Sequence, residues 1–234
     1  MNRPKYGLFV TGTNTEVGKT YVASLIASTL SKNGVRVGVY KPVASGCTRR
    51  PDGTLVSEDA VELWNAAGRP LGLDAVCPQA FERPVAPHLA ARADGRTSDF
   101  SKMIDGLSLW ADFDLVIVEG AGGLMSPISD NHYTADLAAE FGYPVIVVAA
   151  NRLGAINETL QTLICAKQYS KLSVAGVVLN DTHAGGNDES LSTNWHELSK
   201  RCEAPCLCHF SFNDIESATK LAASVDWLAL SRRL

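Results

Sequence analysis

The sequence predicts one α/β domain over residues 1–234, with helices on both faces of an open, mainly parallel sheet. Short β-branched runs alternate with longer segments of helical spacing, and this alternation is typical of βαβ units. Most of the runs are almost continuously apolar, as expected of strands that helices cover on both faces. The 234 residues are 46% apolar and only 20% charged, which is enough hydrophobic side chain to bury one sizeable core.

The predicted elements follow one another in a regular order. Strands are expected at residues 7–11, 35–40, 115–120, 144–150 and 174–179, with a sixth around 205–210. Helices are expected at about residues 19–33, 57–67, 98–111, 133–141, 155–170, 190–201 and 213–223. Four prolines between residues 69 and 96 exclude a continuous helix there and favour a long ordered loop over one end of the sheet.

Charge and hydropathy argue against two classes of partner. Subtracting 25 acidic from 21 basic residues leaves a formal charge of −4, which gives no general attraction to nucleic-acid phosphates. No stretch approaches the roughly 20 consecutive apolar residues that cross a bilayer, and the first apolar run is too short for a signal peptide. We therefore expect a cytoplasmic protein that binds neither nucleic acid nor membrane.

Three of the six cysteines lie close together in the segment CEAPCLC, residues 202–208. Their spacing matches no zinc-binding template, and the chain has no second cysteine cluster. Small apolar side chains in a buried strand are the better explanation. We expect no structural metal here.

The first predicted strand runs into GTNTEVGKT at residues 12–20, directly before a predicted helix. A phosphate-binding Walker A loop requires this order of strand, turn and helix. Backbone N–H groups of such a loop surround a phosphate chain, while Lys19 reaches the terminal phosphates and the Thr20 hydroxyl ligates magnesium. Thr13 stands where the strict pattern has glycine, and a structural turn followed by a surface lysine is the alternative. The flanking elements favour the phosphate loop, and hence a P-loop NTPase-like fold.

Further charged residues follow other predicted strands. Glu119 ends the third strand, where a metal-binding Walker B acid belongs; a surface acid is the alternative, but the glycine-rich residues 120–123 favour close approach to a ligand. Lys41, with Ser45 close behind it, follows the second strand, which we expect to share an edge of the site with the first. A lysine there can neutralise charge on a transferred phosphoryl group, unless it is simply solvated. Asp59, taken alone, is explained as an acid stabilised by a helix dipole.

Six segments resemble, in order and spacing, those of the dethiobiotin synthetases: GTNTEVGKT, YKPVASG, FERPVAPH, VEGAGGLMSPISD, NRLGAIN and VVLND. The resemblance runs from about residue 6 to 210. It implies a homodimeric P-loop enzyme of biotin synthesis that joins diaminopelargonic acid and CO2, using ATP with Mg2+ and releasing dethiobiotin, ADP and phosphate. The implied route passes through a carbamate and a carbamic–phosphoric mixed anhydride, and the second amine then closes the ring.

The resemblance also implies roles for particular residues. Lys41 and Lys19 become catalytic, and Asn180 reads adenine. The implied ATP-binding residues are Glu16, Val17, Gly18, Lys19, Thr20, Tyr21, Asp59, Glu119, Gly120, Ala121, Gly122, Asn180 and Asp181. The implied metal ligands are Thr20, Asp59 and Glu119, which replaces the structural interpretation of Asp59. The implied substrate-binding residues are Thr15, Ser45, Ala155, Ile156 and Asn157, of which the last three offer N–H groups to the substrate carboxylate across the dimer interface.

Two departures from the family pattern stand out. Asn14 occupies a position where the family usually has aspartate, which removes a carboxylate near the substrate amines. Residues 208–211 occupy the adenine-lining turn, where the family usually carries a glycine and a proline.

Two other functions remain open at this stage. A partition or division-site ATPase of the deviant P-loop group would act as a nucleotide switch, but such proteins carry a second lysine early in the loop, where Asn14 stands here. Some dock on membranes through a basic amphipathic C-terminal helix; with Asp226 beside only two arginines, we expect the tail to pack against the domain instead. A small-molecule kinase with the same loop would need no CO2.

Overall fold

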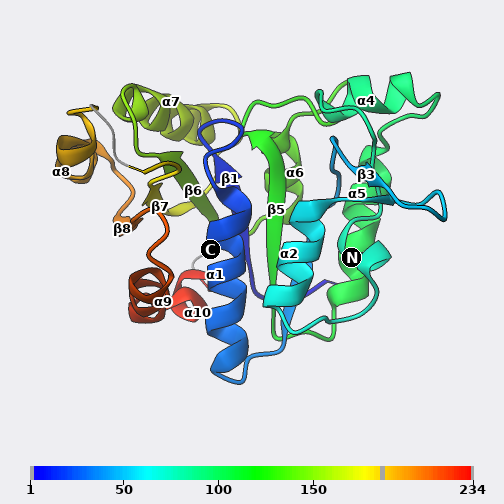
Figure 1. Ribbon diagram of the computed structural model, residues 1–234, viewed down its shortest axis with the longest axis horizontal. Coiled ribbons are helices and arrows are strands. Elements are labelled where there is room, and N and C mark those ends of the chain that lie inside the picture. The colour runs from blue at the N-terminus through cyan, green and yellow to red at the C-terminus, as the bar shows by residue number, and fades with distance from the viewer. Residues whose placement is uncertain (1–2, 185–187, 233–234) are drawn as a thin grey trace.

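The computed structural model describes residues 3–184 and 188–232 (Figure 1). Six parallel strands form one sheet in the order β2-β5-β1-β6-β7-β8. Their bounds are β1 Gly7–Gly12, β2 Val37–Tyr40, β5 Leu115–Gly123, β6 Val145–Ala150, β7 Val174–Asn180 and β8 Cys206–Phe210. This confirms the predicted parallel sheet, including its sixth strand.

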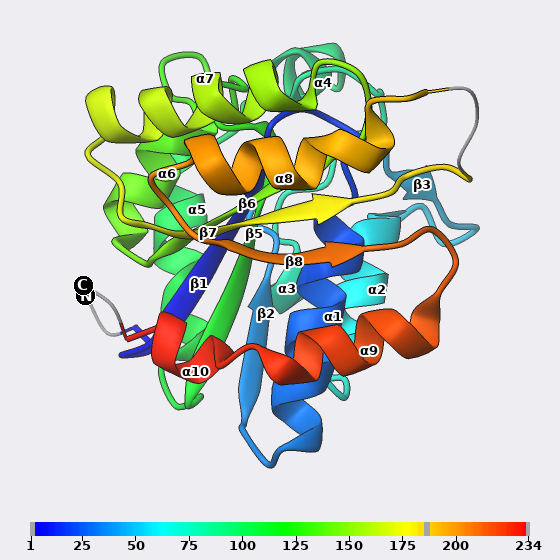
Figure 2. The same ribbon diagram turned by 90° about the vertical axis from the view of Figure 1, so that its left-hand side faces the viewer.

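Helices cover the sheet on both faces, as predicted. Figure 2 shows α1, α2, α9 and α10 on one face and α6, α7 and α8 on the other. The longer helices are α1 Lys19–Lys32, α2 Glu58–Ala66, α6 Thr134–Phe141, α7 Ala155–Gln168, α8 Leu191–Arg201 and α9 Ile215–Ser224. Because both faces are covered, every residue of β1, β2 and β6 is buried.

Several short elements differ from the prediction. The proline-rich segment is not a plain loop: it contains α3 Leu73–Val76 and α4 Pro87–Ala93. Helix α4 can form there because Pro87 lies in its first turn, where the missing N–H of a proline costs no hydrogen bond. The helix predicted at residues 98–111 is α5 Phe100–Asp105 followed by a 3-10 turn, Gly106–Trp110. A two-stranded hairpin, β3 Thr48–Arg49 with β4 Leu55–Val56, was not predicted because its strands are too short to show a period.

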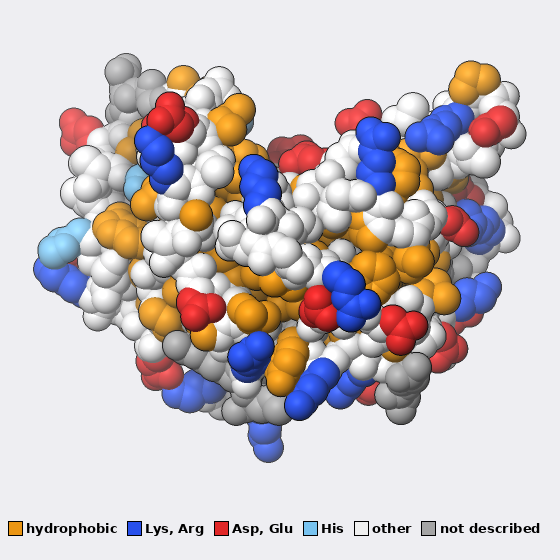
Figure 3. Space-filling view, turned by 90° about the horizontal axis from the view of Figure 1, so that it is seen from below, with side chains coloured by type: hydrophobic (Ala, Val, Ile, Leu, Met, Phe, Trp, Pro, Cys, Tyr) orange, Lys and Arg blue, Asp and Glu red, His pale blue; other side chains and the backbone are white. Residues whose placement is uncertain are grey.

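The C-terminal tail packs on the domain, as expected. In α10, Trp227–Leu230, both terminal residues are buried, and the Trp227 indole N–H donates to the Ala222 carbonyl at 2.7 Å. The face at the lower end of α1 carries acidic and basic side chains interspersed with apolar ones (Figure 3). Within residues 3–184 and 188–232, no helix is both long and apolar enough to cross a membrane.

The clustered cysteines belong mostly to a strand. Cys206 and Cys208 lie in β8, with Cys208 buried, while Cys202 directly follows α8 and is half-buried. The described residues contain no group of three or more histidines, cysteines, aspartates or glutamates placed to hold a metal.

The register of the strands brings the predicted site together. Val10 of β1 lies opposite Glu119 of β5, and Tyr40 of β2 lies opposite Val118. The phosphate loop, Glu119 and Lys41 therefore all leave the sheet at the same edge. Strands β1 and β2 are not neighbours, however, because β5 lies between them. Lys41 therefore reaches the phosphate loop across the end of β5.

Candidate active site

The phosphate loop has a backbone that only particular residues tolerate. Glu16 and Gly18 adopt φ angles of 60° and 87°, in the left-handed region. A Cβ atom added at Gly18 would lie 2.1 Å from the Asn180 amide nitrogen, so this position requires glycine for both conformation and space. Helix α1 begins at the next residue with no acidic residue in its first turn, which leaves its N-terminal N–H groups available to an anion.

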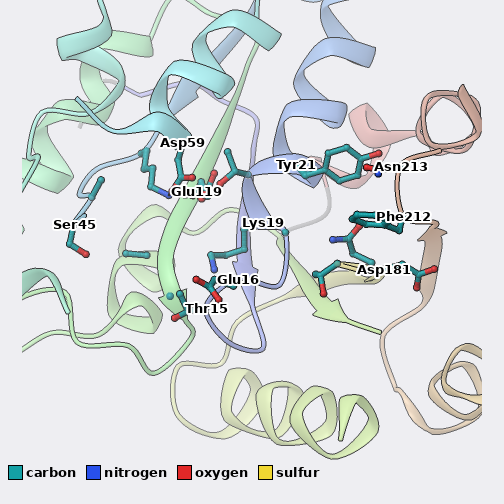
Figure 4. A pocket seen from close by; sticks show the side chains of 18 of the residues that line it. Thr15, Glu16, Lys19, Tyr21, Ser45, Asp59, Glu119, Asp181, Phe212 and Asn213 are labelled. Carbon is teal, nitrogen blue, oxygen red and sulfur yellow. Dashed lines mark hydrogen bonds and ion pairs between the residues drawn. The ribbon is translucent and has the colours of Figure 1, made fainter. Parts of the chain in front are cut away.

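A buried lysine lies between two carboxylates beside this loop. Lys41 is 4% exposed, and its Nζ is 2.6 Å from Asp59 Oδ2 and 2.5 Å from Glu119 Oε1. The Thr20 hydroxyl, in the first turn of α1, donates to the same Glu119 oxygen at 3.0 Å. Thr20, Asp59 and Glu119 belong to α1, α2 and β5, and Lys41 directly follows β2. Figure 4 shows Asp59 and Glu119 close to each other.

The local charges fix the protonation states of the cluster. Burial by itself lowers the pKa of Lys41, but the Glu119 and Asp59 carboxylates outweigh it, and the net effect raises the pKa above the usual value for lysine. Burial raises the pKa of Asp59, and the Lys41 charge and hydrogen bond reverse this to a net lowering. The pKa of Lys19 is lowered, chiefly by burial. Lys41 is therefore a fixed cation against an ionised Asp59.

The oxygen atoms of this cluster fit a magnesium ion. Glu119 is 1% exposed, and its Oε2 is buried without a hydrogen-bond partner among the described residues. An unpartnered buried carboxylate oxygen is costly unless a cation or donor joins it. Mg2+ prefers a few carboxylate or hydroxyl oxygens together with phosphate and water. Thr20, Asp59 and Glu119 supply that donor set next to the phosphate loop.

One cavity of about 580 Å³ joins the phosphate loop to a second, less charged region. Figure 4 shows Tyr21, Phe212 and Asn213 together at one end, away from Asp59, Glu119 and Ser45 at the other. The cavity is lined by Thr15, Glu16, Gly18, Lys19, Thr20, Tyr21, Lys41, Ala44, Ser45, Asp59, Glu119, Ala121, Gly122, Asn180, Asp181, Thr182, Ser211, Phe212, Asn213 and Ile215. The arrangement suits a long anionic ligand with a flat end.

Known proteins share this sequence and this fold. A family model described as an AAA domain matches residues 6–219. The ATP-dependent dethiobiotin synthetase BioD of Rhodopirellula baltica is 45% identical over 210 residues, which cover 84% of this chain and 80% of that protein. The protein of the same name from Aeromonas hydrophila is 40% identical over 206 residues, covering 87% and 89%. The chain belongs to the ATP-dependent dethiobiotin synthetase family.

A likeness to a more distant solved structure concerns the fold alone. The crystal structure of the signal recognition particle receptor FtsY from Elizabethkingia anophelis is 16% identical, with a TM-score of 0.50, over 96% of this chain and 66% of that one. The shared architecture is that of P-loop proteins, so the dethiobiotin synthetase chain has a P-loop NTPase-like fold, as its phosphate loop predicts.

Most residues that the dethiobiotin synthetase resemblance implies line the cavity, but a few lie elsewhere. Val17 is 1% exposed beneath the loop, and a Cβ at Gly120 would point at Thr134 and Phe9, away from the cavity. Residues 155–157 begin α7 and do not line the cavity of their own chain.

The start of α7 nevertheless has free donors. Gly154 precedes the helix at φ 95°, with no side-chain cap. The Ala155 N–H donates to the Arg152 carbonyl at 3.0 Å, whereas the N–H groups of Ile156 and Asn157 find no acceptor within the described parts of the chain. Such a helix start can bind a carboxylate.

Sequence reasoning missed part of the cavity wall. Phe212, Asn213 and Ile215 line it although no motif indicated them. Phe212 is 41% exposed where it lines the cavity, so its ring is accessible to a ligand there. One sequence feature could have indicated these residues: they lie just beyond the last predicted strand, at the carboxyl edge where parallel sheets bind ligands.

Proposed function

We propose that this chain is an ATP-dependent dethiobiotin synthetase, which joins diaminopelargonic acid and CO2 with ATP and releases dethiobiotin, ADP and phosphate. Its family membership supports this activity. The observation that carries the proposal is the buried Lys41 cation, held by Glu119 and Asp59 in the same cavity as the phosphate loop and Ser45. That cavity can hold a nucleotide and a small anionic partner side by side.

ATP would lie along the cavity with its base at the Phe212 end and its phosphates on the loop. Asn180 is 5% exposed, and its Nδ2 already donates to the Val17 carbonyl at 3.1 Å, so its amide is fixed relative to the loop. This rigidity supports the role of Asn180 in reading adenine, while the exposed Phe212 ring offers a surface for stacking.

Mg2+, held by Thr20, Asp59 and Glu119, would neutralise charge on the nucleotide phosphates. Lys19, which lines the same cavity, would add a positive charge to the phosphate site. Its Nζ donates to the Asn14 carbonyl at 3.1 Å, which turns the side chain back over the loop. The Asn14 side chain is engaged locally, since its Oδ1 accepts from the Thr15 N–H at 2.8 Å.

The proposed reaction has three steps, for which the chain supplies charge and position. One amine of the substrate attacks CO2 and loses a proton, forming a carbamate. A carbamate oxygen then attacks the γ-phosphorus, and the bond to ADP breaks. The second amine attacks the carbamate carbon and loses a proton, and phosphate leaves with the bonding electrons. Lys41 stabilises the anionic carbamate oxygen and the transferred phosphoryl group, while Thr15 and Ser45 contact the diamine.

The substrate carboxylate would bind the start of α7 from a second copy of the chain. The free N–H groups of Ile156 and Asn157 support this role, and their distance from their own cavity supports a homodimer with shared sites. Exposed apolar residues in this region add support: Leu153, in the turn before α7, is 78% exposed, and Ile164, on α7, is 62% exposed.

The proposal takes residues 1–234 as one domain acting in the cytoplasm. It is tested by mass spectrometry of the products from Mg-ATP, diaminopelargonic acid and carbon-labelled bicarbonate, with each component omitted in turn. We expect labelled dethiobiotin and equimolar phosphate only in the complete mixture. ATP turnover that ignores the diamine and CO2 would contradict the synthetase and favour a nucleotide switch.

A further inference from the structure

Four polar side chains form a connected group behind the cavity, between β6, β7, β8 and α8. Asn151 Nδ2 donates to Asp181 Oδ1 at 2.8 Å, and Asn151 Oδ1 accepts from Asn194 Nδ2 at 2.9 Å. His209 Nε2 donates to the same Asp181 oxygen at 2.7 Å. Asn151 and Asn194 are 5% and 2% exposed. We call this group the asparagine bridge.

Helix α8 attaches the turn before α7 to this bridge. Asn194 Nδ2 also donates to the Arg152 carbonyl at 3.0 Å. Near the start of α8, Asp188 Oδ2 accepts from the Leu153 N–H at 2.8 Å. The carbonyl and the N–H of the single Arg152–Leu153 peptide unit are therefore both held, the first by Asn194 of α8 and the second by Asp188 in the segment before α8.

The other end of the bridge reaches the nucleotide cavity. Asp181 lines that cavity beside Asn180, and the Asn180 carbonyl accepts from the Asn151 N–H at 2.8 Å. The turn at residues 151–154 thus shares hydrogen bonds with both residues that face the base. Buried amides cost free energy unless they are paired, and a paired network is rigid.

We propose that the asparagine bridge is a positioning unit that couples occupation of the base end of the cavity to the order of the α7 N-terminus. A base held against Asn180 and Asp181 restricts Asn151, and through Asn194 it restricts the Arg152–Leu153 peptide unit that precedes the first N–H groups of α7. None of the bridge residues needs to touch the diamine. This inference rests on the proposed function in one respect: the proposed function supplies the substrate carboxylate that binds the start of α7.

Two substitutions remove hydrogen bonds at opposite ends of the bridge. His209→Leu removes the donor to Asp181, whereas His209→Gln retains an N–H at a similar distance from the backbone and is the conservative variant. Asn194→Ala removes the bonds to Asn151 and Arg152 without touching the His209 contact. Ser192→Ala is the matched control, because Ser192 is exposed on the same helix and bonds only to the nearby Glu189 carbonyl.

The test is hydrogen–deuterium exchange of the full-length protein, followed over residues 151–160 with and without Mg2+ and a non-hydrolysable ATP analogue. We expect the analogue to slow exchange about tenfold in wild type, Ser192→Ala and His209→Gln, a typical coupling strength. We expect no slowing in His209→Leu or Asn194→Ala at analogue concentrations that saturate them. Equal slowing of exchange in all five proteins would overturn the proposal, and this is the result expected if nucleotide in a partner's site slowed exchange directly. No slowing in wild type would also overturn it.

A kinetic measurement adds a second readout. His209→Leu should raise KM for the diamine about tenfold while kcat at saturation stays within about twofold, and His209→Gln should restore KM. An unchanged KM in a folded His209→Leu protein would also overturn the proposal. Because the exchange experiment needs nucleotide alone, a wild type that shows the coupling but makes no dethiobiotin would reject the proposed function and keep the bridge.

Discussion

The two ends of the nucleotide cavity are built on different principles. At the phosphate end, Lys19, Lys41 and Glu119 are charged yet no more than 7% exposed, and each is held by a strand end or helix start. At the base end, Phe212, on the loop after the last strand, and Ile215, at the start of α9, are apolar yet 41% and 69% exposed.

This difference indicates which end of the cavity holds its side chains in a fixed geometry. Buried charges are expensive, so a cluster of them persists only where their geometry is tightly satisfied. Substitutions at the phosphate end should therefore remove catalysis or binding outright. Substitutions on the exposed loop should change affinity alone.

The largest effect is expected from Lys41→Ala. Turnover should fall by at least about a hundredfold, because a preorganised cation aimed at developing charge is lost. Steady-state kcat, with circular dichroism to verify the fold, measures this. Lys220→Ala is the control, since Lys220 is exposed and pairs only within its own helix. A Lys41→Ala protein with near wild-type kcat would remove Lys41 from the mechanism.

Lys19→Ala should weaken ATP binding by roughly ten- to a hundredfold, the equivalent of one charge-assisted hydrogen bond. Displacement of a fluorescent nucleotide gives the dissociation constant directly. If the affinity for ATP were unchanged while that for AMP fell, Lys19 would not face the terminal phosphates.

Phe212→Ala should have a smaller effect at the opposite end of the cavity. Losing an aromatic stacking surface costs about 1 kcal/mol, so Kd for ATP should rise about fivefold with kcat unchanged. Phe212→Tyr keeps the ring and should bind as wild type does. A fall in kcat in Phe212→Ala would contradict the assignment of binding to the base end and catalysis to the phosphate end.

The smallest effect concerns acid stability. The pKa of Asp59 lies below its ordinary value of 3.8, since the Lys41 charge and hydrogen bond outweigh the effect of burial, so its ionised form stabilises the fold above about pH 4. This contribution is lost as pH falls through the folded-state pKa. Because the Asp59 side chain is 49% exposed, solvent screening limits it to less than about 1 kcal/mol.

Urea unfolding of wild type and Asp59→Asn at pH 7 and pH 3 measures this contribution. The stability difference between the two proteins should shrink at pH 3. A difference that is the same at both pH values would mean that Asp59 is not held by Lys41.

The phosphate end was largely predictable from the sequence. Lys19 and Thr20 follow a strand–turn–helix motif, and Glu119 and Lys41 directly follow apolar runs, so a parallel sheet must bring them to one edge. Asp59 was different: its position at the start of a helix has a sufficient local explanation, and only the resemblance indicated a ligand. The structure places it against Lys41.

The base end and the asparagine bridge could not be predicted in the same way. Exposure of Phe212 depends on the path of a loop, which no periodic pattern describes. Asn151, Asn194 and His209 are far apart in sequence and meet only because β6, β7 and β8 are consecutive in the sheet. The first and second strands both end at the site, as the sequence predicted, but the strand order could not be derived from it, and β5 lies between them.

The central claim is that a carbamate oxygen attacks ATP in the cavity where Lys41 lies. Following oxygen-18 from freshly dissolved labelled CO2 into the released phosphate tests it most directly, with Mg-ATP and diaminopelargonic acid present. The account predicts one labelled oxygen in each phosphate, because that oxygen bridges carbon and phosphorus until the second amine closes the ring. Unlabelled phosphate accompanying dethiobiotin would contradict it, since ATP would then have been hydrolysed by water.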